Sequence, residues 1–181
     1  MEKREIKVIY YGPPIVGKFT NIEYIQKWYC ESKKIELEPL CRTGFLSIND
    51  CEFANDNTIE SKNVIIQLPM YPQKFYKDPV RDKIIEGVKA FVYVVDSQKE
   101  RMDANFEYLH QMENYIVKEG FNISNFPIVF QYNKRDLPNI MPIEILNSKL
   151  NRFNAPYFSS IAKNGIGIKE TFSAVLKLLL F

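Results

Sequence analysis

Residues Tyr10–Ile25 read YYGPPIVGKFTNIEYI and contain most of a phosphate-binding loop. Such a loop has a glycine, four variable residues, a second glycine, a lysine and then serine or threonine. Gly12, Gly17 and Lys18 occupy the expected positions, but Phe19 stands where the hydroxyl residue belongs. The loop N–H groups and the following helix N-terminus would surround a phosphate chain, and Lys18 would reach its outer phosphates. The stretch therefore predicts a strand, a phosphate-binding loop and a helix, with one hydroxyl missing.

Apolar runs on either side of this loop predict alternating strands and helices. IKVIYY (6–11) precedes the loop, and GFLSINDCEF and TIESKNVIIQL follow the first helix as two strand-like segments. The residues between these segments, ANDN (54–57), suit a tight turn and predict an antiparallel hairpin. AFVYVVDS (90–97) and FPIVFQYN (126–133) are nearly continuous apolar runs, as central parallel strands should be.

Two further helices can be located from the sequence. Ser97 can cap a helix that runs to about Glu119, where Gly120 supplies the stop. The apolar face of this helix consists of Met102, Phe106, Leu109 and Ile116. A last helix runs from about Gly167 to Phe181. The resulting order, β-α-β-β-α-β-α-β-α-β-α, predicts a mostly parallel, doubly wound sheet of about six strands with flanking helices.

Composition limits the size and surroundings of this fold. With 181 residues, 46% hydrophobic and 25% charged, the chain suits a single domain over residues 1–181. The net charge of +2 arises from 24 basic and 22 acidic residues that are mixed along the chain, so nucleic acid is not an expected partner. The longest apolar run is too short to cross a bilayer and the N-terminus is charged, so we expect no membrane insertion and a cytoplasmic location.

Two short segments near the C-terminus predict recognition of guanine. In NKRD, Asn133 would hold the loop geometry and Asp136 would accept hydrogen bonds from guanine N1–H and the 2-amino group, a donor pair that adenine lacks. In SSIAKNG, the backbone N–H of Ala162 would be free to bind guanine O6 and Lys163 would cover the ring. Because each segment follows a predicted strand, as the phosphate loop does, a GTP or GDP site is favoured over an unrelated α/β domain.

The chain also resembles a known family. The blocks IKVIYYGPPIVGKFTNIEYI, VVDSQKERMDANFEYL and FPIVFQYNKRDLPN are similar to the corresponding blocks of the MglA family, bacterial Ras-like GTPases that set polarity and motility. The resemblance covers nearly the whole chain and implies the small-GTPase fold. It assigns phosphate contacts to Gly17, Lys18 and Thr20, and guanine recognition to Asn133, Lys134, Asp136, Ala162 and Lys163.

The resemblance also identifies a first switch segment in CRTGF (41–45). Arg42 corresponds to the arginine that the family supplies in cis to the transition state, and Thr43 to the threonine that senses the γ-phosphate and the metal. Alternatively, Arg42 is a solvent-exposed loop arginine with no catalytic role. The family further implies a partner, a small Roadblock-type (MglB-like) dimer that acts as activator.

The metal site departs from the family pattern. The family has threonine directly after the loop lysine as a Mg²⁺ ligand, whereas Phe19 offers no oxygen. We therefore expect damaged Mg²⁺ binding, with Thr43 as the remaining candidate ligand. Thr20 is one residue away and would reach the ion if the loop shifted, although octahedral geometry disfavours this alternative. Pro14 replaces a family glycine and removes one N–H from the phosphate cradle.

The second switch departs as well. The family reads roughly VPGQVFY, and this chain reads LPMYPQKFY (68–76), with Met70 where the γ-phosphate-sensing glycine should fall. Gln73 is the nearby glutamine that could orient the attacking water. The aromatic residues Tyr71, Phe75 and Tyr76 suit either a protein-docking surface or a segment collapsed onto its own core. The sequence thus predicts a nucleotide-binding, hydrolysis-poor relative, and the alternative is a constitutive interaction module without switching.

Overall fold

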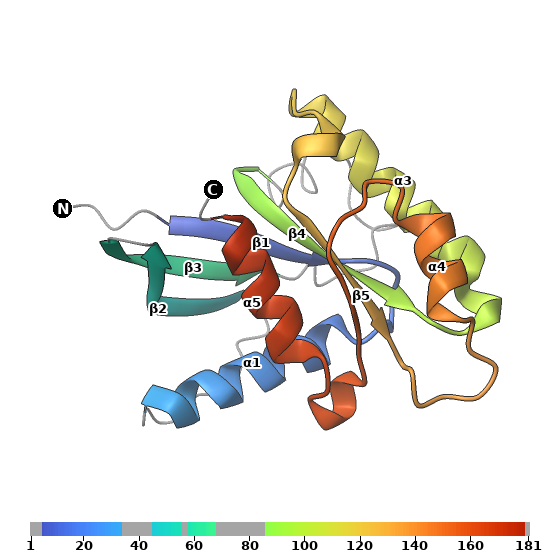
Figure 1. Cartoon of the computed structure of the whole chain (residues 1–181), viewed down its shortest axis with the longest axis horizontal. Helices are drawn as coiled ribbons and strands as arrows, with labels where there is room; N and C mark the ends of the chain where they lie inside the picture. The colour runs from blue at the N-terminus through green and yellow to red at the C-terminus, as the bar shows by residue number, and fades with distance from the viewer. Residues whose placement is uncertain (1–4, 34–44, 56–57, 68–85, 180–181) are drawn as a thin grey trace.

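A six-stranded sheet forms the centre of the molecule (Figure 1). The computed structural model describes residues 5–33, 45–55, 58–67 and 86–179, and for Glu5, Lys33 and residues 45–55 and 58–67 it describes the backbone alone. The strand order is β2-β3-β1-β4-β5-β6, and the pairing of β2 with β3 is antiparallel while the other pairings are parallel. The strands are β1 (Glu5–Tyr11), β2 (Phe45–Asn55), β3 (Thr58–Gln67), β4 (Val88–Asp96), β5 (Ile128–Asn133) and β6 (Tyr157–Ser159). The predicted mostly parallel α/β sheet is confirmed.

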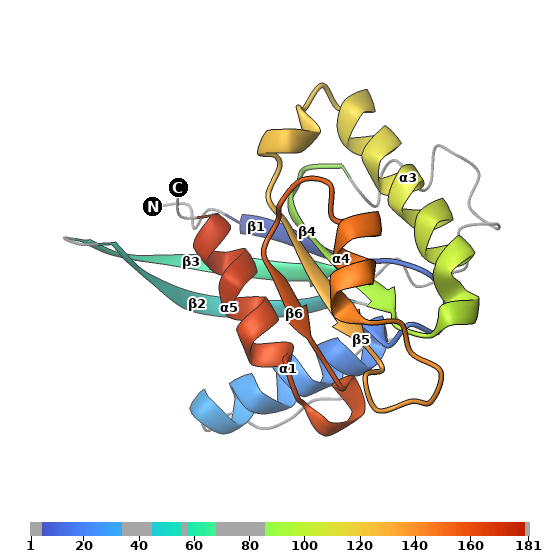
Figure 2. The same cartoon turned by 45° about the vertical axis from the view of Figure 1, so that its right-hand side comes forward.

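Helices cover both faces of this sheet, α1 and α5 on one face and α3 and α4 on the other (Figures 1 and 2). The α-helices are α1 (Lys18–Lys33), α3 (Met102–Lys118), α4 (Ile143–Leu150) and α5 (Ile168–Leu178). Short 3-10 helices are η2 (Lys99–Arg101), η3 (Ile123–Asn125) and η4 (Ala162–Asn164). The helix that the sequence predicts before residue 90 falls outside the described residues.

The core lies in two layers because successive side chains of a strand point to opposite faces. Val8 and Tyr10 of β1 pack with residues of α1 and α5. Ile9 and Tyr11 pack with residues of α3 and α4. In β4 every residue except Lys89 is buried, which confirms the prediction of a strand covered on both faces.

The hairpin prediction is confirmed by the antiparallel pairing of β2 with β3, which carries a register shift between Ile48 and Cys51. Residues 56–57 of the predicted turn lie outside the described residues. At the C-terminus the apolar face of the predicted helix is in place, since Ile168, Phe172 and Val175 are buried.

The predicted start of the helix before Gly120 is wrong. Ser97 does not cap it, because the chain first forms η2 and the α-helix begins at Met102, with no capping hydrogen bond from the side chain of Arg101. The Ser97 hydroxyl is buried without a hydrogen-bond partner among the described residues. The predicted stop is confirmed: Gly120 has a φ of 82°, and the N–H of Phe121 donates to the carbonyl of Ile116.

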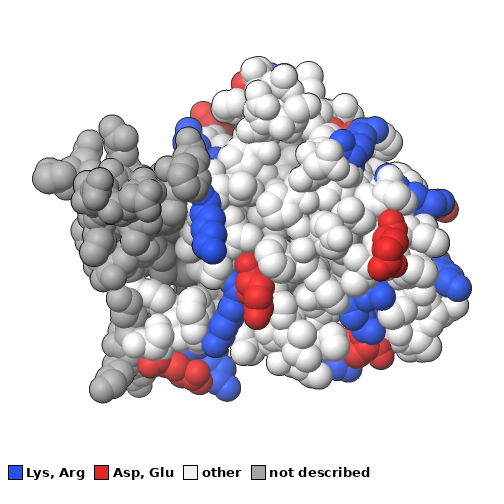
Figure 3. Space-filling model, in the orientation of Figure 1, with Lys and Arg blue, Asp and Glu red and all other residues white. Residues whose placement is uncertain are grey.

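The surface carries charges of both signs. On the face drawn in Figure 3, Lys and Arg side chains are interspersed with Asp and Glu. Among the described residues, no helix combines the length and the apolar character needed to cross a membrane.

Glu113 is a buried carboxylate that links α3 to the segment after α4. Its side chain is 6% exposed, and Arg152 donates to it through Nε at 3.0 Å and through a second guanidinium nitrogen. His110 Nδ1 lies 3.1 Å from the same carboxylate. Within this ion pair the Glu113 side chain is therefore shielded from solvent, whereas the Arg152 side chain is about half exposed.

We expect Arg152→Met to lower the free energy of unfolding by about 1–2 kcal/mol. The buried carboxylate of Glu113 would then be left with His110, which is a weaker partner than the arginine. The double variant Glu113→Gln/Arg152→Met should recover more than half of this loss, since the glutamine is neutral. Urea unfolding of the three proteins measures both effects. Unchanged stability of Arg152→Met would show that the pair behaves like an exposed salt bridge.

Candidate functional site

The loop between β1 and α1 is shaped by close contacts with neighbouring strands. Gly12 has a φ of 139°, and a Cβ at this position would lie 2.2 Å from the carbonyl oxygen of Val94. Gly17 has a φ of 97°, and a Cβ there would lie 2.4 Å from Nδ2 of Asn133. Both glycines are therefore required by the fold, and the loop lies directly against β4 and the end of β5.

Side chains hold the carbonyl groups of this loop. Lys18 Nζ donates to the carbonyl oxygens of Gly12 and Pro13 at 2.7 and 2.6 Å. Asn21 Nδ2 donates to the carbonyl of Gly17 at 2.9 Å. Lys18 is partly buried, and this burial lowers the pKa of its ammonium group to about 8. The Lys18 ammonium group donates to neutral carbonyl groups here. A phosphate group placed against the loop would supply the negative charge that these carbonyl partners lack.

Asn133 joins the phosphate loop to the loop that follows β6. Its Nδ2 donates to the carbonyl of Val16 at 2.8 Å, and its Oδ1 accepts from the hydroxyl of Ser160 at 3.1 Å. The same Oδ1 accepts from the backbone N–H of Ala162 at 2.9 Å. The expectation of a free N–H at Ala162 is therefore wrong, because the buried amide oxygen of Asn133 already uses it. Guanine O6 would have to share or replace this hydrogen bond.

Asp136 and Lys163 meet at the rim of the site. Lys163 Nζ lies 2.5 Å from Oδ2 of Asp136, and the lysine side chain is 64% exposed. The hydrogen bond from Lys163 lowers the pKa of Asp136, which keeps the carboxylate ionised at neutral pH. An ionised carboxylate accepts hydrogen bonds only, which is the property that recognition of guanine N1–H and the 2-amino group requires.

Lys134 points into the protein. Its backbone has a φ of 63°, and its Nζ lies 2.8 Å from Oδ2 of Asp96, whose side chain is 1% exposed. Asp96 is a site residue that the sequence analysis missed. A carboxylate at the end of an apolar strand was a usable signal, because the carboxyl ends of such strands line ligand sites.

A buried polar network, which the sequence analysis also missed, supports the phosphate loop from the protein interior. Gln131 Nε2 lies 2.9 Å from Oδ1 of Asn21 and 3.2 Å from Oγ1 of Thr171, and all three residues are buried. Since Asn21 in turn donates to Gly17, this network connects β5 and α5 to the phosphate loop. Nothing in the sequence pattern indicated this connection.

The position that follows Lys18 offers no Mg²⁺ ligand. Phe19, at the second position of α1, is 45% exposed and has no oxygen, and the adjacent Thr20 is partly buried in the same helical turn. Among residues 5–33 and 86–179, no cluster of three or more His, Cys, Asp or Glu side chains is suited to a metal. The predicted residues Arg42, Thr43 and Gln73 lie outside the described residues.

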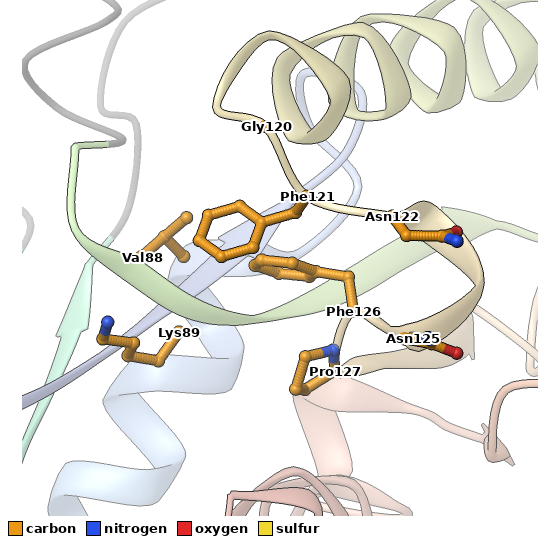
Figure 4. A pocket seen from close by; sticks show the side chains of 8 residues that line it. All are labelled: Val88, Lys89, Gly120, Phe121, Asn122, Asn125, Phe126 and Pro127. Atoms are coloured by element: carbon orange, nitrogen blue, oxygen red, sulfur yellow. The ribbon is translucent and has the colours of Figure 1, made fainter.

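A pocket of about 400 Å³ lies elsewhere, at the amino end of β4 and the C-terminal end of α3 (Figure 4). The rings of Phe121 and Phe126 meet edge to face there, with centroids 5.3 Å apart, and Lys89 is the titratable residue of the lining. The phosphate loop follows β1 at the carboxyl ends of the parallel strands. The pocket is therefore separate from the candidate nucleotide site.

The mostly parallel sheet, the phosphate loop after β1 and the Asn133–Asp136 segment at the end of β5 define the class of small Ras-like GTPases. Comparison with known proteins gives the family within that class. The chain is 37% identical over 183 aligned residues to the mutual gliding-motility protein MglA of Myxococcus xanthus (strain DK1622), and the alignment covers 98% of this chain and 92% of that protein. No protein-family model matches the chain. The chain belongs to the MglA-like small GTPase family.

Lys18 should make stability depend on pH. In the folded protein Lys18 releases its proton near pH 8, whereas in the unfolded chain it holds the proton up to the ordinary value of 10.5. The unfolded state therefore binds more protons between these values, and stability rises with pH in this window. We expect the stability of the natural protein relative to Lys18→Met to rise by about 1–2 kcal/mol between roughly pH 7.5 and 9.5.

Urea unfolding of both proteins at the two pH values measures this difference. A constant difference would mean that the ammonium group keeps its ordinary pKa in the folded protein.

Proposed function

We propose that the protein binds GTP and GDP in the cytosol, with the phosphates on the loop 12–18 and the base against Asp136. The observation that carries this proposal is the position of Asn133, which bonds to Val16 of the phosphate loop and to Ala162 of the loop beside the base. A nucleotide that spans these two loops would have its phosphates near Lys18 and its base near Asp136 and Lys163. The carboxylate of Asp136 then favours guanine over adenine.

We further propose that GTP hydrolysis is weak. Phe19 removes the usual Mg²⁺ ligand, and the sequence of the second switch has Met70 in place of the glycine. A bound Mg²⁺ would neutralise the negative charge of the phosphates during hydrolysis, and in related enzymes an arginine at the transition state accelerates the reaction by about 10³ to 10⁵. We propose that Arg42 and Gln73 support the remaining GTP hydrolysis. Thr43 is the residue proposed to contact a metal ion. Binding depends less on these groups than turnover does, because Lys18 and the loop amides remain.

The proposed protein partner is a Roadblock-type (MglB-like) protein at the two switch segments, in a polarity- or motility-type role. The support is membership of the MglA-like family. A constitutive interaction module that keeps the fold without nucleotide switching is the competing function, and nucleotide binding separates the two.

Guanine preference tests the first proposal. We expect GDP and GTP at 100 times their dissociation constants to stabilise the protein by about 2.7 kcal/mol, and ATP at the same concentration to stabilise it much less. Asp136→Asn should remove the difference between guanine and adenine nucleotides while the fold persists. Thermal shift measurements check this. Equal shifts with ATP, or no shift with any nucleotide at millimolar concentration, would contradict the proposal.

Phe19→Thr tests the second proposal. In the natural protein we expect GTP affinity to change little when EDTA replaces Mg²⁺, because the position after Lys18 has no oxygen. Phe19→Thr should make binding Mg²⁺-dependent and restore little hydrolysis, since the second switch is unchanged. Calorimetric titration with and without Mg²⁺ measures affinity, and single-turnover phosphate release measures hydrolysis, each with and without a Roadblock-type partner.

Phe121→Thr is the matched control, because Phe121 is 47% exposed, close to the 45% of Phe19, and lines the pocket at the other end of the sheet. Strong Mg²⁺ dependence and rapid hydrolysis by the natural protein would overturn the proposal.

A further inference from the structure

Arg101 contacts the phosphate loop but belongs neither to that loop nor to the two segments expected to bind guanine. It is the last residue of η2, immediately before α3. One of its terminal nitrogens, Nη2, donates to the carbonyl oxygen of Pro14 at 3.2 Å. Its Nε lies 3.6 Å from Oδ2 of Asp96, and its side chain is 36% exposed. A single guanidinium group therefore reaches both the phosphate loop and the buried carboxylate of Asp96.

Asp96 is a rigid anchor for this arginine. Its carboxylate accepts from Lys134 Nζ at 2.8 Å and from the backbone N–H of Gln98 at 3.2 Å. Its own backbone is fixed by the Asn105 amide, which accepts from the Asp96 N–H at 3.1 Å and donates to the Asp96 carbonyl at 2.8 Å. Since Asp96 and Asn105 are both fully buried, neither can move far.

The peptide that Arg101 holds has a special place in the loop. Pro13 and Pro14 have no backbone N–H, so Ile15 supplies the first N–H after Gly12. In a trans peptide the carbonyl of one residue and the N–H of the next point in opposite directions, and the described chain has no cis peptide. The bond from Arg101 to the Pro14 carbonyl therefore directs the N–H of Ile15 to the other side of the peptide.

We propose that Arg101, anchored by Asp96, is a positioning residue that holds the Pro14–Ile15 peptide so that the N–H of Ile15 serves the phosphate chain of the nucleotide. This inference rests on the proposed nucleotide binding. It gives the loop a fixed shape in spite of its two prolines, and it connects the start of α3 to the phosphate end of the site. The base end of the site does not depend on this bond.

Arg101→Met removes the donors and keeps an apolar stem of similar length. Affinities for GDP, GMP and IDP separate the two ends of the site, because GMP lacks the β-phosphate that loop amides bind and IDP lacks the 2-amino group that Asp136 reads. We expect the ratio of GDP to GMP affinity to fall about tenfold, as for loss of one charge-assisted hydrogen bond, and the ratio of GDP to IDP affinity to stay unchanged. A role in stability alone would lower the melting temperature and leave both ratios unchanged.

Lys7→Met is the matched control. Lys7 Nζ also donates to a backbone carbonyl, that of Glu86, at 3.0 Å, but at the amino end of the sheet. Both ratios should match the natural protein. Arg101→Lys should recover part of the lost GDP to GMP ratio, since lysine keeps the charge without the planar fork that serves two acceptors at once.

An unchanged GDP to GMP ratio in Arg101→Met would overturn the positioning role, even if guanine nucleotides bind to the natural protein. A fall in the GDP to IDP ratio would also overturn it, because the effect would then extend to the base end. If the natural protein binds no guanine nucleotide, the proposed function fails and this inference fails with it.

Discussion

The hydrogen bonds of the Asn133 amide are the constraint on which the candidate site depends. One end of this buried side chain holds the carbonyl of Val16, and the other end holds Ser160 and Ala162. The three segments come from the ends of β1, β5 and β6 and are far apart in the sequence. A side chain that both donates and accepts is needed to connect them, and an amide does so without introducing a charge.

The surrounding polar network extends this constraint into the core. Gln131 and Thr171 reach the phosphate loop through Asn21. Buried networks of this kind stabilise a single arrangement when their groups are satisfied and are costly when they are not. Here Oε1 of Gln131 has no hydrogen-bond partner among the described residues. The shape of the phosphate loop is thus coupled to the packing of α1 and α5 on the sheet.

The parts of the molecule that could be predicted are those determined by local pattern. Continuous apolar runs located β4 and β5, and the glycine spacing located the loop before α1, because each depends on residues close in sequence. The use of the Ala162 N–H by Asn133 could not be predicted, since it depends on packing between distant segments. The start of α3 was misplaced for a related reason: η2 holds Arg101 against Pro14, and the helix begins only after this contact.

The backbone of Ile15, in the phosphate loop, is strained. Ile15 is a β-branched residue with a φ of 64°, a conformation that such residues rarely adopt and that stores about 1–3 kcal/mol of strain. Its side chain is 87% exposed, so packing does not compensate for the strain. The hydrogen bonds to its neighbours Pro14 and Val16 must do so, and they come from Arg101 and Asn133. The loop sequence is therefore not a portable module: grafted onto another strand–helix junction without these two donors, it would relax to a different backbone.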